Sequence, residues 1–600
     1  MHRSATRNLP TLAALVAAAA SNGLAGAASA QCTHVKAVGL TQEDNGWAGE
    51  SVAVQGNLML LGEPNAGFTD SGSVSILERD ALGEWLVVGA VQAPNTGNNA
   101  NDRFGSAVAL SGGVILAGGP YGGANDAGMV CFFENIGPYN WSFKTAHTPA
   151  DSAASDNFGR AVAMDGDFAV VGAPFHDKVE GLMLADTGGA YFFKRNMDGT
   201  WSPDGKASEP FTFLRSFQDH FGASVVMKGD LAIIGCPDGS QTGPADAGWV
   251  RVYQRSGGVW NVLTTLTAPG GGQTGGGFGR SLAYDGEYLV VGAPETDFVS
   301  DDAGVAHVYR RSGVSFIYDG QLSAEFPDEH VGFGYRVTVA NGRIAVTKDE
   351  RSVDLFSRTV GGSWVRQRTL IDPDGFHRFG FALASRGDDL IVGDPYDSTE
   401  FHTESGAAYR YAFGFGADLA ANAAQLRVGD VFSGCTSLAT NDGSATCGQS
   451  STSRDVWYAL SVTQTRTVAL STLGSDFDTV LSVHSAAPGN AGNQIVCNDD
   501  YAAPQRWSRV TFTAQPGMIY FVRVAGYQGA FGEFRLAATA TVSCPGDANG
   551  DGLINFADLN TVLAQFNTPG ANQSGDFDLD GDVDFADLNT VISGFNSACN

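Results

Sequence analysis

The chain has 600 residues, enough for more than one domain, and 43% of them are hydrophobic, enough for several cores. With 79 glycines and only 16% charged residues, the composition favours turn-rich β structure over helices. The formal net charge of -29 argues against nucleic acids or anionic membranes as main partners, because both would be repelled.

The N-terminus has the pattern of a secretory signal. Arg3 and Arg7 precede an apolar run that ends at Ala28-Ser29-Ala30, which predicts a signal peptide over residues 1–30. No later segment reaches the roughly 18 uninterrupted apolar residues of a spanning helix. We therefore expect no membrane span and a secreted, extracellular or cell-surface protein.

Eight cysteines in an exported chain can form disulfides. Cys544 and Cys599 bracket the last segment, and Cys435 and Cys447 flank a Gly/Ser/Thr/Asn loop. These two pairs are the predicted bonds. The sequence leaves open the partners of four others: Cys32, Cys131, Cys236 and Cys497.

A two-strand phrase recurs along the first two thirds of the chain. "FGRAVAMDGDFAVVGAP" at 158–174 returns as "FGRSLAYDGEYLVVGAP" at 278–294. The opening Phe-Gly pair occurs at 104, 158, 221, 278, 333 and 379, with a weaker first copy at Trp47-Ala48. Six copies continue to a Gly-x-Pro phrase, while the sixth in order has Thr-Lys-Asp at 347–349. This spacing, with strand alternation and turn glycines, indicates a β-propeller or solenoid.

Each copy predicts four strands, with a tryptophan where the fourth begins. We expect these tryptophans to pack between adjacent sheets, with ligand stacking as the alternative: Trp85, Trp141, Trp201, Trp260 and Trp364. Copy seven lacks a fourth strand, and residues 33–40 precede copy one as such a strand should. Pairing them would close a seven-bladed ring and remove exposed sheet edges.

These Phe-Gly and Gly-Ala-Pro phrases make residues 33–413 resemble FG-GAP repeats, the family that includes the integrin α-subunit propeller. The resemblance implies a β-propeller fold. Calcium-binding members carry an Asp-rich loop between the two phrases, which here is shortened to "MDGD", "YDGE" or "MKGD". We therefore expect no calcium in the propeller.

The loops that follow Gly-x-Pro vary in length and share one propeller face with the connections between copies, so this face is the predicted site for a glycan or protein ligand. Six of the loops carry an acid two residues before a glycine, read either as a turn residue or as part of a cation-attracting rim: Asp70, Asp126, Asp186, Asp246, Asp302 and Glu404. Neighbouring aromatic residues would suit sugar stacking: Phe68, Tyr121, Phe175, Phe298 and Tyr396.

Residues 414–543 read as a β-sandwich of short alternating strands. The phrases "DVWY", "SDFDTVLSV" and "YFVRVAGY" resemble the bacterial pre-peptidase C-terminal type of jelly-roll module, which implies an accessory role. Two roles are open for four acids here, as turn and strand-end residues or as calcium ligands: Asp476, Asp478, Asp499 and Asp500.

Residues 544–600 contain two loops, 547–558 and 576–587, with oxygen side chains at positions 1, 3, 5, 9 and 12. Calcium prefers six to eight oxygen ligands, and this spacing around a tight loop supplies them. Two calcium ions are predicted, with Leu553 and Asp582 offering main-chain carbonyls and these side chains as ligands: Asp547, Asn549, Asp551, Asn555, Asp558, Asp576, Asp578, Asp580, Asp584 and Asp587.

Each loop leads into an apolar-periodic helix, "FADLNTVLAQF" or "FADLNTVISGF". Paired loop–helix units with Asp at position 12 resemble the type I dockerin, which implies docking to a cohesin-like domain. Positions 10 and 11 are Phe556-Ala557 and Phe585-Ala586 here, rather than the hydroxyl-bearing pair of cellulosomal dockerins.

The predicted architecture is mainly β: a signal peptide (1–30), a seven-bladed propeller (31–413), a jelly-roll-like β-sandwich (414–543) and a small α-helical dockerin (544–600). The sequence has no H-E-x-x-H or G-x-S-x-G motif, and His176, His330, His377 and His402 have no evident partner. A non-catalytic binding or adhesion protein is the favoured function. The alternative is a dockerin-bearing glycoside hydrolase or polysaccharide lyase, or another component of a polysaccharide-degrading complex.

Overall fold

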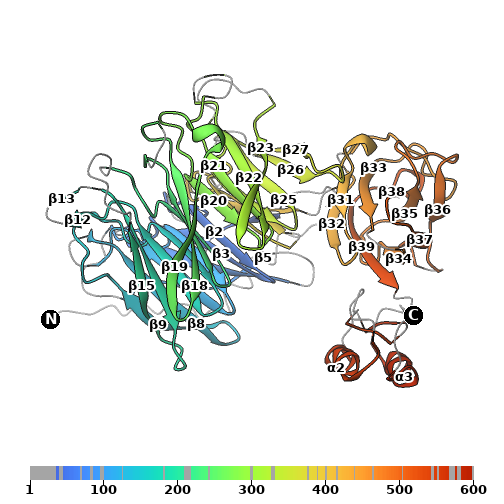
Figure 1. Cartoon of the computed structure of the whole chain (residues 1–600), viewed down its shortest axis with the longest axis horizontal. Helices are drawn as coiled ribbons and strands as arrows, with labels where there is room; N and C mark the ends of the chain where they lie inside the picture. Colours follow the sequence, from blue (N-terminus) through green and yellow to red (C-terminus); the bar gives the residue numbers. More distant parts are fainter. Residues whose placement is uncertain are drawn as a thin grey trace, which may run out of the picture.

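A computed structural model of the chain shows a large β region, a smaller β domain beside it and two helices near the C-terminus (Figure 1). The prediction of a mainly β chain is confirmed. The structure describes residues 35–39, 45–67, 70–80, 85–94, 101–123, 126–179, 183–184, 186–208, 218–240, 244–297, 300, 302–325, 332–349, 351–373, 378–387, 389–398, 402–413, 416–437, 439–462, 465–502, 505–541, 546–549, 553–566, 575–577 and 583–596. The predicted signal peptide lies outside these residues.

The large region consists of four-stranded antiparallel sheets. The first four sheets contain β2 (Ser51–Gln55), β3 (Leu58–Glu63), β4 (Ser73–Arg79) and β5 (Trp85–Val91); β6 (Ala107–Ser111), β7 (Val114–Gly119), β8 (Met129–Gly137) and β9 (Asn140–His147); β10 (Ala161–Asp165), β11 (Phe168–Ala173), β14 (Gly189–Arg195) and β15 (Trp201–Ser208); and β16 (Ser224–Lys228), β17 (Leu231–Cys236), β18 (Trp249–Ser256) and β19 (Val259–Thr267). A short hairpin, β12 (Lys178–Val179) and β13 (Met183–Leu184), lies between β11 and β14.

The next sheets contain β20 (Ser281–Tyr284), β21 (Tyr288–Ala293), β22 (Val305–Ser312) and β23 (Ser315–Leu322); β24 (Val337–Ala340), β25 (Arg343–Asp349), β26 (Ser352–Arg358) and β27 (Trp364–Ile371); and β28 (Ala382–Arg386), β29 (Asp389–Asp394), β30 (Ala407–Ala412) and the N-terminal β1 (Val35–Ala37). The first strands of successive sheets contact one another in a circle, from β2 through β6, β10, β16, β20 and β24 to β28, which contacts β2. The architecture is therefore β-propeller-like.

The pairing predicted for the N-terminal strand is confirmed. β1 lies antiparallel to β30, with Val35 opposite Arg410 and Ala37 opposite Ala408. The N-terminus thus supplies the outer strand of the last sheet, and an edge that would otherwise be open is covered.

The two repeated phrases form a backbone contact between neighbouring sheets. The Phe-Gly glycines have φ between 90° and 98°, which favours glycine: Gly49, Gly105, Gly159, Gly222, Gly279, Gly334 and Gly380. The Gly-x-Pro glycines have no such φ, but each lies against the carbonyl of a Phe-Gly glycine in the next sheet. A Cβ added to Gly172, for example, would lie 2.0 Å from the Gly222 oxygen. Both glycines are thus required, one by its φ and the other by close approach.

Copy six replaces this contact with a hydrogen bond. Thr347 stands where the other copies have the Gly-x-Pro glycine, and its Oγ1 donates to the Gly380 carbonyl at 2.8 Å. The departure in sequence therefore keeps the junction between the two sheets.

The first copy is one residue out of the predicted register. Ala48 bridges Gly406 as Phe104 bridges Gly72, and Gly49 has the positive φ of the Phe-Gly glycine. The prediction that Trp47-Ala48 stands for Phe-Gly is wrong. Trp47-Ala48 matches Phe-Gly in residue type, whereas the backbone conformation decides the register.

The tryptophans pack between sheets as predicted. Trp201 stacks on Phe132 of the preceding sheet with ring centroids 4.5 Å apart, and Trp260 stacks on Phe192 at 4.6 Å. Trp364 meets Tyr288 edge-on at 5.2 Å. Each ring thus fills the space between the fourth strand of its sheet and the sheet before it.

Next to the closing strand lies a group of buried acids. Lys36 of β1 pairs with Asp397 at 2.6 Å, and the Tyr409 hydroxyl donates to the same carboxylate at 2.6 Å. Asp394 is fully buried, and its Oδ2 has no hydrogen-bond partner among the described residues. Burial, together with the charges of Asp372 and Asp397, raises the pKa of Asp394 to about 8.

The smaller β domain has two sheets that share one hydrophobic core, the arrangement of a β-sandwich. One sheet contains β31 (Ala424–Leu426), β33 (Asp455–Ser461), β38 (Ile519–Gly526), β35 (Thr479–His484) and β36 (Gln494–Asn498); the other contains β32 (Val431–Cys435), β39 (Glu533–Thr541), β34 (Arg466–Ser471) and β37 (Arg509–Ala514). Arg523 of β38 and Asp455 of the adjacent β33 form a fully buried ion pair, a contact between residues 68 positions apart that the sequence pattern does not indicate.

The C-terminal helices α2 (Phe556–Gln565) and α3 (Phe585–Ser593) lie below the β-sandwich in Figure 1. They share a small core that includes Ile554, Val562 and Val591. Within the described part of the chain, no helix is both long and apolar enough to span a membrane.

One cysteine prediction is wrong. Cys447 is bonded to Cys497, with Cα atoms 6.2 Å apart, rather than to Cys435, which is itself in another disulfide. β36 brings Cys497 to the loop that holds Cys447, a contact across 50 residues that spacing alone does not reveal. Cys131 and Cys236 are buried thiols. Cys32, Cys544 and Cys599 lie outside the described residues.

The glycine contact predicts a specific loss of stability. Gly172→Ala should cost about 2 kcal/mol or more, because the new methyl group meets the Gly222 carbonyl and the sheets must separate. Gly89→Ala is the control, since a Cβ there has nothing within 4 Å. Calorimetry should show a lower melting temperature for Gly172→Ala only, and equal melting temperatures would contradict the contact.

Because the pKa of Asp394 is raised in the folded chain, we expect the stability of the protein to fall as the pH rises. The unfolded chain releases this proton near pH 4, whereas the folded chain holds it until about pH 8, so stability falls as the pH rises across that window. Asp394→Asn should therefore raise the melting temperature at pH 8 and change it little at pH 4. The same substitution at exposed Asp246 should give no such difference, and a pH-independent effect at Asp394 would contradict the assignment.

Candidate binding site at the centre of the ring

A depression of about 640 Å³ opens at the centre of the ring. The residue that follows Phe-Gly in each repeat lines it: Glu50, Ser106, Arg160, Ala223, Arg280, Tyr335 and Phe381. Phe175, from the loop after β11, and His220, from the connection before β16, line it as well. The depression thus lies on the face that carries the variable loops.

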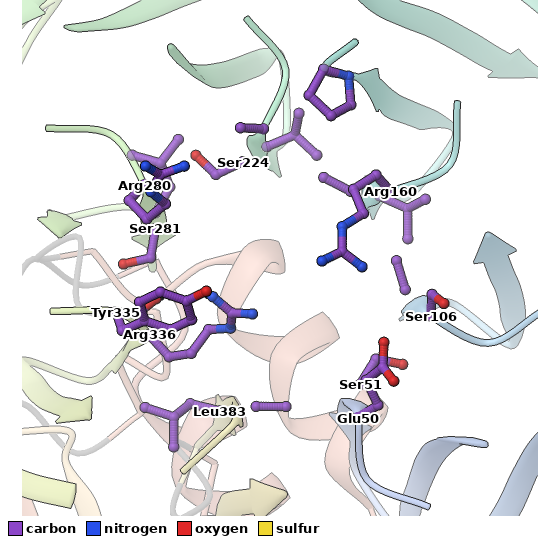
Figure 2. A pocket seen from close by; sticks show the side chains of 18 of the residues that line it. Glu50, Ser51, Ser106, Arg160, Ser224, Arg280, Ser281, Tyr335, Arg336 and Leu383 are labelled. Carbon is purple, nitrogen blue, oxygen red and sulfur yellow. Dashed lines mark hydrogen bonds between the residues drawn. The ribbon is translucent and has the colours of Figure 1, made fainter. Parts of the chain in front are cut away.

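Three arginines and two carboxylates, those of Glu50 and Asp238, give the depression its charge. Figure 2 shows the guanidinium groups of Arg160 and Arg336 pointing into the opening, with the Glu50 carboxylate on the same side as Ser106. Arg160 is exposed, and no side-chain hydrogen bond or ion pair joins it to a described residue. Burial raises the pKa of Glu50, although the neighbouring arginines act to lower it.

Arg280 and Arg336 are held in different ways. Arg280 pairs with Asp238 and Glu295, each at 3.0 Å. Arg336 stacks over the rings of Tyr335 at 4.7 Å and Phe381 at 5.4 Å, and it donates to the Tyr335 carbonyl. Partial burial of the guanidinium group lowers the pKa of Arg336.

The wall near Phe175 is a fixed network. Phe175 meets the His220 ring edge-on at 4.8 Å, and His220 Nδ1 lies 2.6 Å from Asp238 Oδ2. Burial acts to raise the pKa of Asp238. The hydrogen bond from His220 and the charge of Arg280 outweigh this effect and lower that pKa. Asp238 is therefore an ionised partner that fixes both neighbours.

His176 has partners that the sequence did not show. Its Nδ1 lies 2.7 Å from Asp156, and its Nε2 lies 2.8 Å from the Lys206 ammonium, which also pairs with Asp151 at 2.6 Å. Asp156 and Lys206 are 20 and 30 residues from His176 in sequence, so only the fold brings them together. His330 and His377 lie outside the described residues.

The six loop acids are turn residues, which confirms that interpretation. All have φ between 49° and 57°: Asp70, Asp126, Asp186, Asp246, Asp302 and Glu404. Of the loop aromatics, Phe175 and Tyr121 are 36% and 37% exposed. Tyr396 instead packs edge-on against Trp47 at 5.3 Å, while Phe68 and Phe298 lie outside the described residues.

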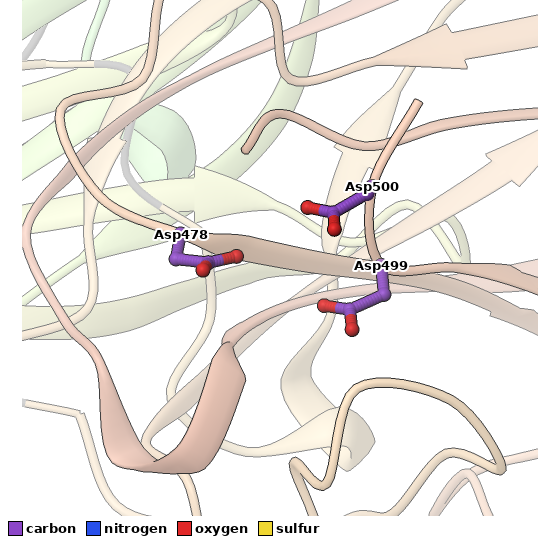
Figure 3. A group of neighbouring side chains, drawn as sticks. All are labelled: Asp478, Asp499 and Asp500. Carbon is purple, nitrogen blue, oxygen red and sulfur yellow. The ribbon is translucent and has the colours of Figure 1, made fainter. Parts of the chain in front are cut away.

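The β-sandwich brings three of its four predicted acids together. Carboxylate oxygens of Asp478, Asp499 and Asp500 lie within 4.8 Å of one another (Figure 3). Burial, together with the charges of Asp500 and Asp478, raises the pKa of Asp499 to about 6. Asp476 is not in this group.

The C-terminal loops each bury two of the predicted calcium ligands. Asp547 and Asp558 are 2% and 0% exposed in the first loop, and Asp576 and Asp587 are 5% and 1% exposed in the second. Asp558 accepts from the backbone nitrogens of Asn549 and Asn555, and Asp587 accepts from that of Asp584. Paired buried carboxylates suit a hard divalent cation.

The ends of these loops also begin the helices. Asn555 caps α2 and Asp584 caps α3, each through a side-chain oxygen that accepts from the backbone nitrogen two residues later. Leu553 is 52% exposed. Four predicted ligands lie outside the described residues: Asp551, Asp578, Asp580 and Asp582.

A family model described as FG-GAP repeat matches this chain twice, at residues 141–193 and 260–309. The chain therefore contains FG-GAP repeats. Each matched segment joins the fourth strand of one sheet to the first three strands of the next. No curated protein matches the chain.

Among solved structures, the crystal structure of Saccharomyces cerevisiae Sqt1 is similar, with 10% sequence identity and a TM-score of 0.35. The match covers 63% of this chain and 99% of that one. Agreement at this level carries no argument about function.

Proposed function

We propose that the protein is a secreted, non-catalytic binding or adhesion protein whose FG-GAP region is a closed seven-bladed propeller. The ligand, an extracellular glycan or protein, binds at the centre of the loop-bearing face. The observation that carries this proposal is the depression of about 640 Å³ lined by the residue after Phe-Gly in every repeat. Its volume is in the range of ligand pockets.

The construction of the ring supports a binding role. The repeated glycines and tryptophans are used to join sheets, so the positions facing the depression are free to vary in chemistry. Their side chains differ from sheet to sheet, from Glu50 to Arg160 to Tyr335. A rigid frame that presents varied side chains loses little conformational freedom on binding.

We assign residues 414–543 to an accessory jelly-roll-like module of the pre-peptidase C-terminal type and residues 544–600 to a type I dockerin that docks on a cohesin-like domain. The pairing of two similar loop–helix units with buried acids at positions 1 and 12 supports the second assignment. Calcium would be held by those acids with the other oxygens of each loop, and would neutralise their charge.

Binding is tested with the full-length secreted chain on an array of polysaccharides and extracellular proteins. Phe175→Ala should weaken binding by about tenfold, because an aromatic wall of the depression is lost. Tyr121→Ala is the matched control, since Tyr121 is equally exposed but lies outside the depression. Absence of any ligand, or cleavage of a bound polysaccharide, would contradict the proposal.

Calcium binding is tested by calorimetric titration of the full-length chain. Asp551→Ala and Asp580→Ala should each remove one bound ion, because each deletes a carboxylate from one loop. Asn560→Ala, an exposed change on α2, should leave the number of ions unchanged. If the double variant Asp551→Ala/Asp580→Ala binds as many ions as the unaltered protein, the ligand assignment fails.

A further inference from the structure

We infer that the central depression binds an anionic sugar, a uronate or a sulfate ester, between Arg160 and Arg336. This inference rests on the proposed binding function and names the chemistry of its ligand. A guanidinium group presents paired N–H donors that match the oxygens of a carboxylate or a sulfate.

Arg160 and Arg336 are the cations available to a ligand. Arg160 is exposed, and its guanidinium makes no side-chain hydrogen bond or ion pair with the residues that the structure describes. Arg336 has no carboxylate partner within the same part of the chain; its one hydrogen bond goes to the Tyr335 carbonyl. Arg280, by contrast, is already paired with Asp238 and Glu295.

The acids near the opening do not neutralise these two arginines. Asp238 is committed to His220 and Arg280. Among the described residues that line the depression, Glu50 is then the one remaining carboxylate, and it faces two cations. The depression is thus locally positive in a protein whose formal net charge is -29. The chain as a whole repels anions, so the local excess of positive charge is a specific property of the depression.

The remaining lining favours a sugar over an acidic peptide. The rings of Tyr335 and Phe175 are 46% and 36% exposed beside the arginines, and such faces accept the C–H surface of a sugar ring. Ser224 and Ser281 donate their hydroxyl hydrogens to carbonyls of the next sheet, so their oxygens can still accept from sugar hydroxyls. The Glu50 carboxylate offers a further acceptor.

The test uses the full-length chain and calorimetric titration with two charged probes and their neutral counterparts. Oligogalacturonate is compared with oligogalactose, and dextran sulfate with dextran, so that the carboxylate and sulfate sources are separated. We expect at least one charged probe to bind and both neutral probes to bind at least tenfold more weakly.

Two variants with opposite charge changes make the test specific. Arg160→Gln should weaken binding of the charged probe by about tenfold or more, because a charge-assisted contact is lost. Glu50→Gln should strengthen it several-fold, because the opposing carboxylate is removed. Arg351→Gln, an exposed change of the same charge outside the depression, should have no effect.

Unchanged binding in Arg160→Gln, or an equal response to Arg351→Gln, would overturn the inference. Poly-glutamate that binds as tightly as the charged sugars, with the same dependence on Arg160, would also overturn it. A neutral glycan whose binding falls in Phe175→Ala would refute the anionic ligand while leaving the proposed binding function intact. Failure of every array ligand would refute the proposed function itself.

Discussion

The large β region depends on one contact: a glycine in one sheet against the backbone carbonyl of a glycine in the next. Gly172 and Gly222 show it, since a single added carbon would lie 2.0 Å from that oxygen. No side chain fits between the two backbones, so the spacing of neighbouring sheets is fixed by peptide groups. Thr347 is the informative exception, because its hydroxyl bonds to the Gly380 carbonyl across the same junction.

This contact also determines where the proposed ligand site lies. The glycine holds its own backbone against the neighbouring sheet, and the residue after it is then turned toward the ring centre. Seven such positions line the depression, and none of them takes part in the glycine contact through its side chain. The sequence of the repeat can therefore stay uniform while the chemistry at the centre changes from Glu50 to Arg160.

The strands and the inter-sheet tryptophans were predictable because the repeat shows each of them several times. The pairing of β1 with β30 was predictable too, because copy seven lacks a fourth strand and residues 33–40 have the pattern of a strand that precedes the first copy and belongs to no sheet of its own. The register of the first copy is obscured in sequence because Ala48 replaces the phenylalanine, whereas the Ala48–Gly406 bridge and the φ of Gly49 reveal it.

Contacts between distant residues were beyond the reach of sequence. Cys447 bonds to Cys497 because β36 passes the loop that holds Cys447. His176, in the loop after β11, meets Lys206 of β15, a strand two places away in the same sheet. The arginines of the depression are hidden in sequence for another reason. Arg160 and Arg280 stand inside the phrase that defines the repeat, where uniform glycines and strand residues dominate the pattern. The residue after each Phe-Gly, which differs from copy to copy, is the signal that marks them.

The central claim is that the ring presents a ligand site at its centre, and a structure of the full-length chain with tetragalacturonate bound tests it most directly. The account predicts an ordered sugar carboxylate between the guanidinium groups of Arg160 and Arg336, with a sugar ring beside Tyr335. An ordered oligosaccharide found only on the outer strands, or only between the ring and the β-sandwich, would contradict it.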